Sequence, residues 1–475
     1  MYIGLDLGTS GLKGIVLDDS QTIVAEATAP LDVQRPHPGW SEQDPAAWIT
    51  AAEQVLEALK GQTDVSSAKA IGLSGQMHGA TLVNKSLTAI RPAILWNDTR
   101  ASKEAAALDT QNAHEATGNI VFPGFTAPKI NWLRTHEPDS LTDLWKVLLP
   151  KDYLRLWLTG EAVTDPSDAA GTSWLDTANR DWSDAMLTAT GLTRDHMPTI
   201  AEGPEKTGEI RDDLAARFGL PKGLPVAAGG GDNAASAIGL GIVKPGQAFV
   251  SLGTSGVLFA PSDGYRPAPE TAVHTFCHAL PDTWHQMGVI LSATDSLNWL
   301  ASQLDAEPKA LTDALGPLQA PERPLFLPYL GGERTPHNDA RIRAQFLHLD
   351  HATDREGLTR AVVEGVTHAL RDCRDALAAT GTRIDRLLAT GGGARSTYWL
   401  QAIATSLDTP IDVPETENGA AFGAARLAML CAGQAGVLDT PRIARRIDPD
   451  PALTDAFTEA HTRYKAAYTA LKGLT

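Results

Sequence analysis

The sequence LGTSG occurs twice in this chain, at residues 7–11 within YIGLDLGTSGLKGIVLDD and at residues 252–256 within AFVSLGTSGVLFA. Each copy lies between two apolar, β-branched runs, a pattern typical of two strands joined by a tight turn. Glycines tolerate unusual φ angles in such a turn, and its backbone N–H groups and hydroxyls can together bind an anion. A single copy is more often a plain hairpin, whereas two copies in equivalent contexts predict an internal duplication.

Length, composition and charge narrow the class of protein. The chain has 475 residues, which predicts two or three domains, and its net charge of −17 argues against a nucleic-acid or anionic membrane partner. We find neither a secretory signal nor a run of about 18 apolar residues, so no membrane span is expected. The three cysteines (Cys277, Cys373 and Cys431) form no CxxC motif. These features predict a cytoplasmic enzyme without disulfides or structural zinc.

The order of patterns along the chain predicts two halves that begin alike. Residues 1–30 are typical of a strand meander, residues 45–59 of a helix that starts at Asp44-Pro45, and residues 101–220 of mostly helical structure. The pattern then restarts with VAAGGGDN at residues 226–233, and residues 248–260 repeat the strand–LGTSG–strand unit. We therefore predict two α/β domains, residues 1–241 and 242–475.

The two LGTSG copies differ at the position before their first residue. Asp6 precedes the first copy and Ser251 precedes the second. One carboxylate can hold Mg²⁺ through water, whereas a second would repel the phosphates of a nucleotide. Lys13 could add a positive contact beyond the first turn. A third glycine turn, residues 391–393, follows an apolar strand and favours close approach to a ligand, most plausibly adenosine.

Further polar residues follow predicted strands in the first half. Asp232, in the glycine-rich GGGDN turn, could accept the proton of a substrate hydroxyl that attacks a γ-phosphorus, or it could only bond its own backbone. His78, in SGQMHG, could bond a sugar hydroxyl beside Met77, although a lone histidine is more often structural. Trp96, Asn97 and Asp98 close another predicted strand and could line the same site, or Asp98 could form a structural pair with Arg100.

The motifs taken together resemble those of the FGGY carbohydrate kinases, and within that family its xylulokinases. The resemblance runs from end to end in family order through GQMHGATL, AILWND, GFTAPK, LLPKDYLRLWLTG, GGGDNAA, LPYLGGERTPH, GGGARS and NGAAFGAA. Residues 124–136 meet the family's first pattern fully. Residues 344–364 meet the second imperfectly, because His348 stands where glycine is usual and Gly357 where a polar residue is usual.

The resemblance implies a fold, a reaction and a set of site residues. The fold would be two actin-like, ribonuclease H-like ATPase domains with ATP and sugar in the cleft between them, and the reaction the ATP- and Mg²⁺-dependent phosphorylation of D-xylulose at its 5-hydroxyl. The N-terminal domain would bind the sugar and carry the base, and the C-terminal domain would bind the nucleotide. The family is often dimeric, so a homodimer is possible. By position, the implied roles are catalytic base, Asp232; sugar binding, Met77, His78, Asp232 and Asn233; metal association, Asp6; phosphate contact, Thr9, Lys13, Gly253 and Thr254; and nucleotide contact, Asn298, Gly392, Gly393 and Ser396.

Two alternatives remain at this point. One is a kinase of the same family that acts on another ketose or polyol, such as ribulose; glycerol is disfavoured because glycerol kinases carry Arg-Glu in place of Met77-His78. The other is a non-catalytic actin-like ATP-binding protein, which the pairing of GGGDN with the MHG turn disfavours.

Overall fold

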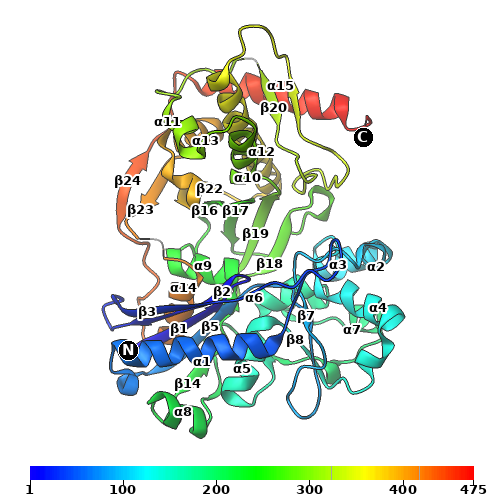
Figure 1. Ribbon diagram of the computed structural model, residues 1–475, viewed down its shortest axis with the longest axis vertical. Coiled ribbons are helices and arrows are strands. Elements are labelled where there is room, and N and C mark those ends of the chain that lie inside the picture. Colours follow the sequence, from blue (N-terminus) through cyan, green and yellow to red (C-terminus); the bar gives the residue numbers. More distant parts are fainter. Residues whose placement is uncertain (323, 417, 475) are drawn as a thin grey trace. The chain divides into compact units, whose positions relative to one another are not determined.

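The computed structural model describes residues 1–322, 324–416 and 418–474 (Figure 1). The chain forms two compact units, each assembled from separated segments. The first unit comprises Met1–Val243, Phe276–Trp284 and Asn418–Thr440, and the second comprises Lys244–Thr275, His285–Glu417 and Pro441–Thr475.

A seven-stranded sheet forms the centre of the first unit, in the order β13-β14-β5-β1-β2-β3, with β15 also paired to β5. Strands β1 and β2 form an antiparallel hairpin around the first LGTSG turn, while β5 and β14 extend the sheet in parallel. The strands are β1 (Tyr2–Leu7), β2 (Gly11–Leu17), β3 (Ile23–Pro30), β5 (Ala70–Gly75), β13 (Lys206–Glu209), β14 (Pro225–Ala227) and β15 (Gly230–Gly231).

The second unit repeats this arrangement in a sheet of order β18-β19-β17-β16-β22-β23-β24. Strands β16 and β17 form the hairpin around the second LGTSG turn, and β22 and β23 follow in parallel. The shared hairpin–parallel–parallel topology confirms the predicted duplication. The strands are β16 (Gly246–Leu252), β17 (Gly256–Ser262), β18 (His274–Cys277), β19 (Trp284–Ile290), β22 (Ile384–Thr390), β23 (Ile411–Pro414) and β24 (Ile443–Ile447).

Helices bury the faces of both sheets. The helix expected over residues 45–59 is α1 (Pro45–Gln62), whose Asp44 side chain accepts the N–H of Ala46 at the N-terminus, and whose apolar face is buried in the first core. In the second unit α12 (Arg355–Ala379) plays the same part. The other helices outside residues 101–220 are α9 (Asp232–Leu240), α10 (Thr294–Gln303), α11 (Pro308–Asp313), α13 (Thr397–Leu407), α14 (Ala420–Cys431) and α15 (Thr454–Leu471).

Helix α14 comes late in the chain yet packs on β1 and β5 of the first sheet, as Figure 1 shows by the orange-brown ribbon beside the blue strands. Glycines make this contact close. A Cβ at Gly72 would lie 1.8 Å from the carbonyl oxygen of Ala424, and one at Gly423 would lie 1.7 Å from that of Ala235. The motif NGAAFGAA therefore serves packing, because any larger residue at these positions would force the helix away from the sheet.

The region 101–220 only partly meets the expectation of mostly helical structure, because short strands separate its helices. The helices are α2 (Ser102–Leu108), α3 (Gln111–Thr117), α4 (Thr126–His136), α5 (Pro150–Thr159), α6 (Pro166–Ala169), α7 (Asp184–Ala189) and α8 (Asp212–Phe218). The remaining short strands of the molecule are β4 (Glu42–Gln43), β6 (Thr81–Val83), β7 (Ala93–Ile94), β8 (Lys146–Leu148), β9 (Val163–Thr164), β10 (Leu175–Asp176), β11 (Asp181–Trp182), β12 (Thr199–Ile200), β20 (Leu325–Leu327) and β21 (Gln345–Leu347).

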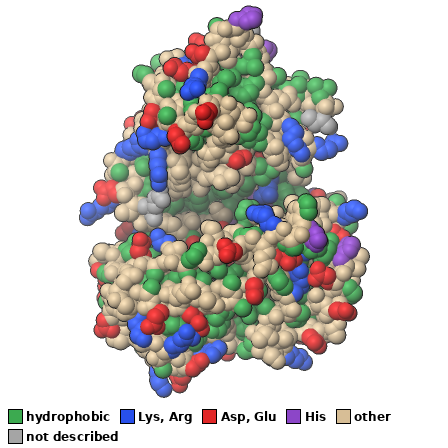
Figure 2. Space-filling model, in the orientation of Figure 1, with side chains coloured by type: hydrophobic (Ala, Val, Ile, Leu, Met, Phe, Trp, Pro, Cys, Tyr) green, Lys and Arg blue, Asp and Glu red, His purple; other side chains and the backbone are tan. Residues whose placement is uncertain are grey.

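Among the described residues, none of the helices has the length and apolar character needed to cross a membrane. On the face shown in Figure 2, basic side chains occur in small groups among acidic and uncharged ones.

Candidate active site

Three strand ends of the first sheet bring the predicted catalytic residues together. In the parallel pairing of β1 with β5, Asp6 lies opposite Ser74 and Leu7 opposite Gly75. Strand β15 pairs with the same end of β5, so that Gly231 also lies opposite Gly75. Because parallel strands end at one edge of a sheet, Asp6 and the residue after Gly231, which is Asp232, meet at that edge.

Two carboxyl groups at this edge have raised pKa values. Burial and the neighbouring Asp6 raise the pKa of Asp232 to about 7, against the opposing effect of hydrogen bonds from Asn233. Those bonds are donated to Asp232 Oδ1 by the backbone N and Nδ2 of Asn233, at 2.7 and 2.9 Å. Burial likewise raises the pKa of Asp6 to about 6. A carboxyl group with a pKa near neutrality suits reversible proton transfer.

Hydrogen bonds with neighbouring side chains of the first unit hold the first LGTSG turn at Thr9. Thr9 Oγ1 donates to Gln76 Oε1 at 3.1 Å, and Gln43 Nε2 donates to the Thr9 carbonyl at 2.7 Å. Trp96 Nε1 donates to Thr9 Oγ1 at 3.0 Å, although 46% of Trp96 is exposed. Lys13, by contrast, is exposed on β2 with its Nζ 3.3 Å from Glu26 Oε2. The turn is therefore fixed in shape before any anion binds.

The predicted sugar-binding pair follows β5 directly. Met77 is buried and packs over the GGGDN turn, since a Cβ at Gly231 would lie 3.0 Å from Met77 Cγ and Sδ. His78 has a positive φ of 68°, places Nδ1 2.6 Å from the Gly171 carbonyl oxygen, and stacks on Phe125 with ring centroids 4.6 Å apart. Met77, His78, Asp232 and Asn233 thus belong to one cluster of adjoining loops.

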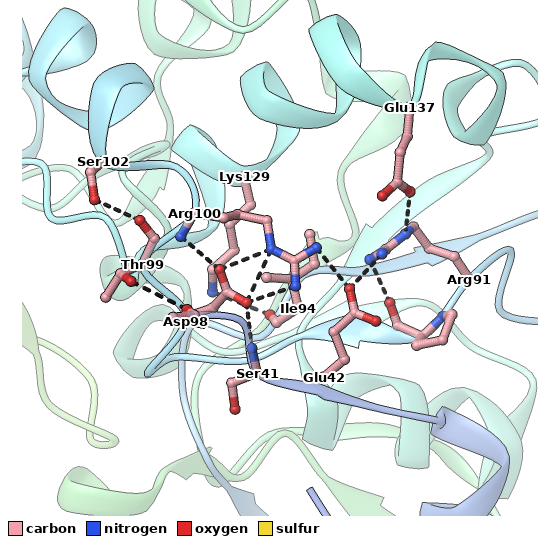
Figure 3. A network of polar contacts seen from close by, with 12 residues as sticks. Ser41, Glu42, Arg91, Ile94, Asp98, Thr99, Arg100, Ser102, Lys129 and Glu137 are labelled. Carbon is pink, nitrogen blue, oxygen red and sulfur yellow. Dashed lines mark hydrogen bonds and ion pairs between the residues drawn. The ribbon is translucent and has the colours of Figure 1, made fainter. Parts of the chain in front are cut away.

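A buried lysine fixes the backbone of His78. Lys129 Nζ donates to the His78 carbonyl at 2.9 Å and to the Ile94 carbonyl at 3.2 Å, and Thr126 Oγ1 donates to the same His78 carbonyl at 3.1 Å. Figure 3 shows Lys129 reaching from α4 to the end of β7. Burial lowers the pKa of Lys129 to about 7. These bonds stabilise the positive φ of His78, which costs energy in any residue other than glycine.

The alternatives for Asp98 and Arg100 are settled by Figure 3 in favour of a structural pair. Arg100 Nη2 donates to Asp98 Oδ2 at 2.7 Å and Arg100 Nη1 lies 2.7 Å from Glu42 Oε1, with all three side chains at most 9% exposed. Arg91 joins Glu42 to Glu137 in the same network. This network fixes β4, and β4 carries the Gln43 that bonds Thr9.

In the second unit the LGTSG turn is bonded to the start of α10. The backbone N of Thr294 donates to the Gly253 carbonyl at 2.9 Å, and the N of Ala293 donates to the Thr254 carbonyl at 2.8 Å. The end of β22 approaches the same turn at Gly391, whose φ is 85° and where a Cβ would lie 2.7 Å from the Leu252 carbonyl oxygen. Only glycine allows this approach.

A pocket of about 450 Å³ opens beside this turn, within the second unit. It gathers the nucleotide residues expected from the sequence, namely Asn298, Gly392, Gly393 and Ser396, with Leu297, Trp399 and Lys309 among the other lining residues. A Cβ at Gly392 would meet no atom within 4 Å. Ser396 Oγ also accepts the N–H of Trp399 and so caps α13. The volume and the mixed lining suit a nucleoside.

A larger hollow of about 800 Å³ in the first unit lies elsewhere, around β11 and β12. Its cationic side chains are already engaged. Arg180 is paired with Glu202 at 2.6 Å, Arg194 with Asp181 and Asp184, and Lys146 donates to two backbone carbonyls. We assign no part of the site to it, because volume without available polar groups is weak support for a ligand.

Comparison with known proteins now places the chain in a family. Residues 1–239 match the N-terminal domain, and residues 248–432 the C-terminal domain, of the FGGY family of carbohydrate kinases. The chain belongs to the FGGY family. A xylulose kinase of Escherichia coli K12 is 49% identical over 437 residues, which cover 91% of this chain and 90% of that protein. Such extended identity also confirms the expected class of reaction, the ATP-dependent phosphorylation of a sugar.

Solved structures agree with this assignment to the FGGY kinases. A crystal structure described as a xyloylose kinase from Brucella ovis is 56% identical, with a TM-score of 0.98 and full coverage of both chains. The structure of a xylulose kinase from Rhodospirillum rubrum is 29% identical, with a TM-score of 0.94 over 100% of this chain and 99% of that one. The predicted fold class, two actin-like α/β domains, is confirmed.

Several residues that shape the site were missed from the sequence. They are Gln43, Gln76, Thr126 and Lys129, together with Arg155, which bonds the strand before the GGGDN turn, and Ser167, which bonds the turn itself. The signal for two of them was present, because Lys129 and Arg155 are cations within apolar helical stretches, where a charge is buried only if it is bonded.

Proposed function

We propose that this chain is a xylulokinase, which transfers the γ-phosphoryl group of ATP to the 5-hydroxyl of D-xylulose. The observation that carries the proposal is the adjacency of the GGGDN turn and the Met77-His78 turn on paired strands of an FGGY kinase. The names of the relatives at 49% and 47% identity support the choice of sugar.

In the proposed mechanism Asp232 is the general base. Met77, His78 and Asn233 bind the sugar so that its primary hydroxyl reaches the Asp232 carboxylate oxygen that does not bond Asn233. Asp232 accepts the hydroxyl proton as the oxygen attacks the γ-phosphorus, and it later returns that proton to solvent. The two hydrogen bonds from Asn233 keep the carboxylate oriented during the transfer.

Mg²⁺ fits the residues at this edge of the sheet. Among the described residues, Asp6 Oδ1 is a buried oxygen without a hydrogen-bond partner, and no cluster of three or more His, Cys, Asp or Glu side chains could hold a metal by itself. Such a site suits an ion held by one carboxylate, water and substrate phosphates. When bound, Mg²⁺ supplies charge neutralisation for the phosphates. We propose Asp6 as the residue that associates with it.

The remaining assignments follow the same reasoning. Thr9, Lys13, Gly253 and Thr254 are proposed phosphate contacts, and the pocket that contains Asn298, Gly392, Gly393 and Ser396 is the proposed adenosine site. Residues 1–241 would form the sugar-binding and catalytic domain and residues 242–475 the nucleotide domain. A cytoplasmic location and a homodimer complete the proposal.

The experiment that tests this function combines a sugar panel with one variant. Wild-type protein is assayed with D-xylulose, ribulose and glycerol through coupled ADP detection, and D-xylulose should give the highest kcat/KM. Asp232→Asn should lower kcat by at least about 100-fold, as expected for loss of a general base, while an ATP analogue still raises Tm. Activity within about tenfold of wild type, worth about 1.4 kcal/mol of barrier, would exclude Asp232 as base.

A further inference from the structure

The GGGDN turn is held from below by two buried charged side chains of helix α5. Arg155 binds the strand that leads into the turn, because its Nη2 donates to the carbonyls of Ala227 and Ala228 at 2.8 and 2.5 Å. Lys151 lies one helical turn earlier and is fully buried. Both cations are therefore placed on the side of α5 that faces this turn.

Lys151 organises a set of carboxylates beside the turn. Its Nζ lies 2.5 Å from Asp152 Oδ1, 2.8 Å from Asp165 Oδ2 and 3.3 Å from Asp168 Oδ2, and all four side chains have 0% exposure. A buried ion pair costs desolvation energy and is poor support for stability alone. We therefore look for the role of this cluster in the position of the GGGDN turn beside it and not in stability.

Ser167 connects this cluster to the turn. Its hydroxyl donates to Asp165 Oδ1, and the backbone N–H of Gly231 donates to its oxygen at 3.1 Å. A backbone N–H only donates hydrogen bonds, so the Ser167 oxygen accepts from Gly231 and the hydroxyl hydrogen points to Asp165 Oδ1. The orientation of the hydroxyl is thus set by Lys151 through Asp165.

The N–H group whose hydrogen bond Ser167 accepts belongs to Gly231, the residue immediately before the proposed base Asp232. Gly231 ends β15 and Asp232 begins α9, so the Gly230–Gly231 peptide that Ser167 holds is the one directly before the peptide bond to Asp232. Gly231 also packs against Met77, since a Cβ on Gly231 would lie 3.0 Å from Met77 Cγ and Sδ. A shift of this peptide would therefore move the carboxylate relative to the sugar-binding side chains.

We propose that Ser167, oriented by Asp165 and Lys151, is a positioning residue that sets the carboxylate of Asp232 against the sugar hydroxyl. The proposal rests on the proposed function, because it takes Asp232 to be the base. Ser167 is fully buried, and its hydroxyl bonds Asp165 and Gly231. It acts through the Gly231 peptide, and its loss lowers kcat because a misplacement of about 1 Å can cost about 100-fold in rate.

The test compares four variants under saturating D-xylulose and ATP. Ser167→Ala should lower kcat by about 10- to 100-fold, with the KM for each substrate within about threefold of wild type. Ser167→Cys, which keeps a weak acceptor of similar size, should recover part of the loss. Thr117→Val removes a buried hydroxyl bonded to Ala113 and Asn119, away from this turn, and matches the stability cost. Asp232→Asn reports on the base itself.

Each outcome is decisive. The proposal is supported if Ser167→Ala loses kcat, Thr117→Val with the same fall in Tm does not, and Asp232→Asn is inactive. It is overturned alone if Ser167→Ala keeps kcat within about threefold while Asp232→Asn is inactive, or if Thr117→Val loses as much kcat as Ser167→Ala. If Asp232→Asn keeps its activity, the base assignment fails and the positioning role fails with it.

Discussion

Two neighbouring glycines of the proposed adenosine site should respond oppositely to substitution. Gly392 lines the pocket of about 450 Å³, and a Cβ there would meet no atom within 4 Å. A leucine at this position enters open space, so Gly392→Leu should change the free energy of unfolding by no more than about 0.5 kcal/mol. Gly391→Ala should instead destabilise the fold.

The sizes of both effects follow from the structure. A leucine side chain in the pocket would displace the nucleoside from two contacts worth about 0.5–1.5 kcal/mol each, a loss of about 1–3 kcal/mol that raises the KM for ATP by about 5- to 150-fold. At Gly391 the φ of 85° and a Cβ 2.7 Å from the Leu252 carbonyl oxygen impose strain. Strain of this kind costs about 1–3 kcal/mol and lowers Tm by several degrees.

Steady-state kinetics and thermal melts separate the two. For Gly392→Leu we expect an unchanged Tm, an unchanged KM for the sugar, and loss of the Tm increase that an ATP analogue gives wild type. If its KM for ATP stays within about twofold of wild type, the pocket is not the nucleotide site. A Gly391→Ala protein as stable as wild type would contradict the argument from close approach.

Two further predictions concern other buried groups. Lys129→Met should raise the KM for the sugar about 5- to 50-fold and leave that for ATP unchanged, because two carbonyls, including that of His78, lose their donor; an equal change in both KM values would refute this. Burial raises the pKa of Glu364 from 4.5 to about 8. Its contribution to stability is full below pH 4.5 and is lost as the pH rises through about 8, so Tm should fall less steeply over pH 5–8 in Glu364→Gln than in wild type, and identical slopes would contradict the cause.

The sequence predicted those parts of the fold that short-range patterns determine. The hairpins around both LGTSG turns and the helix after Asp44 follow from residue periodicity and turn chemistry, and all three are present. The packing of α14 on the first sheet could not be predicted, because it depends on the close approach of Gly72 to Ala424, more than 300 residues apart in the chain. Small residues signal close packing without naming the partner.

The site was predicted to a similar depth. Residues in glycine turns after strands, such as Asp232 and Gly392, are recognisable because turn chemistry and position coincide. The residues that hold these turns are not, since Lys129 and Ser167 act on backbone atoms of distant loops. His348 shows the same limit in reverse. It stands where the family usually has glycine, and the structure gives it a φ of 61°, a left-handed conformation that glycine adopts more easily than histidine.

The two units place different chemistry on one topology. At equivalent positions of the duplicated hairpins, Asp6 pairs in register with Ser74 in the first sheet, whereas Ser251 pairs with Thr390 in the second. Strand β15 brings Asp232 to the first edge, where burial and the neighbouring Asp6 raise the pKa of Asp232. At the second edge the corresponding strand end continues into Gly391 and the open pocket. Proton transfer needs a carboxyl group whose pKa is close to neutrality, whereas nucleoside binding needs uncharged space. The replacement of Asp6 by Ser251 at the equivalent position of the second hairpin therefore lets one topology meet both needs.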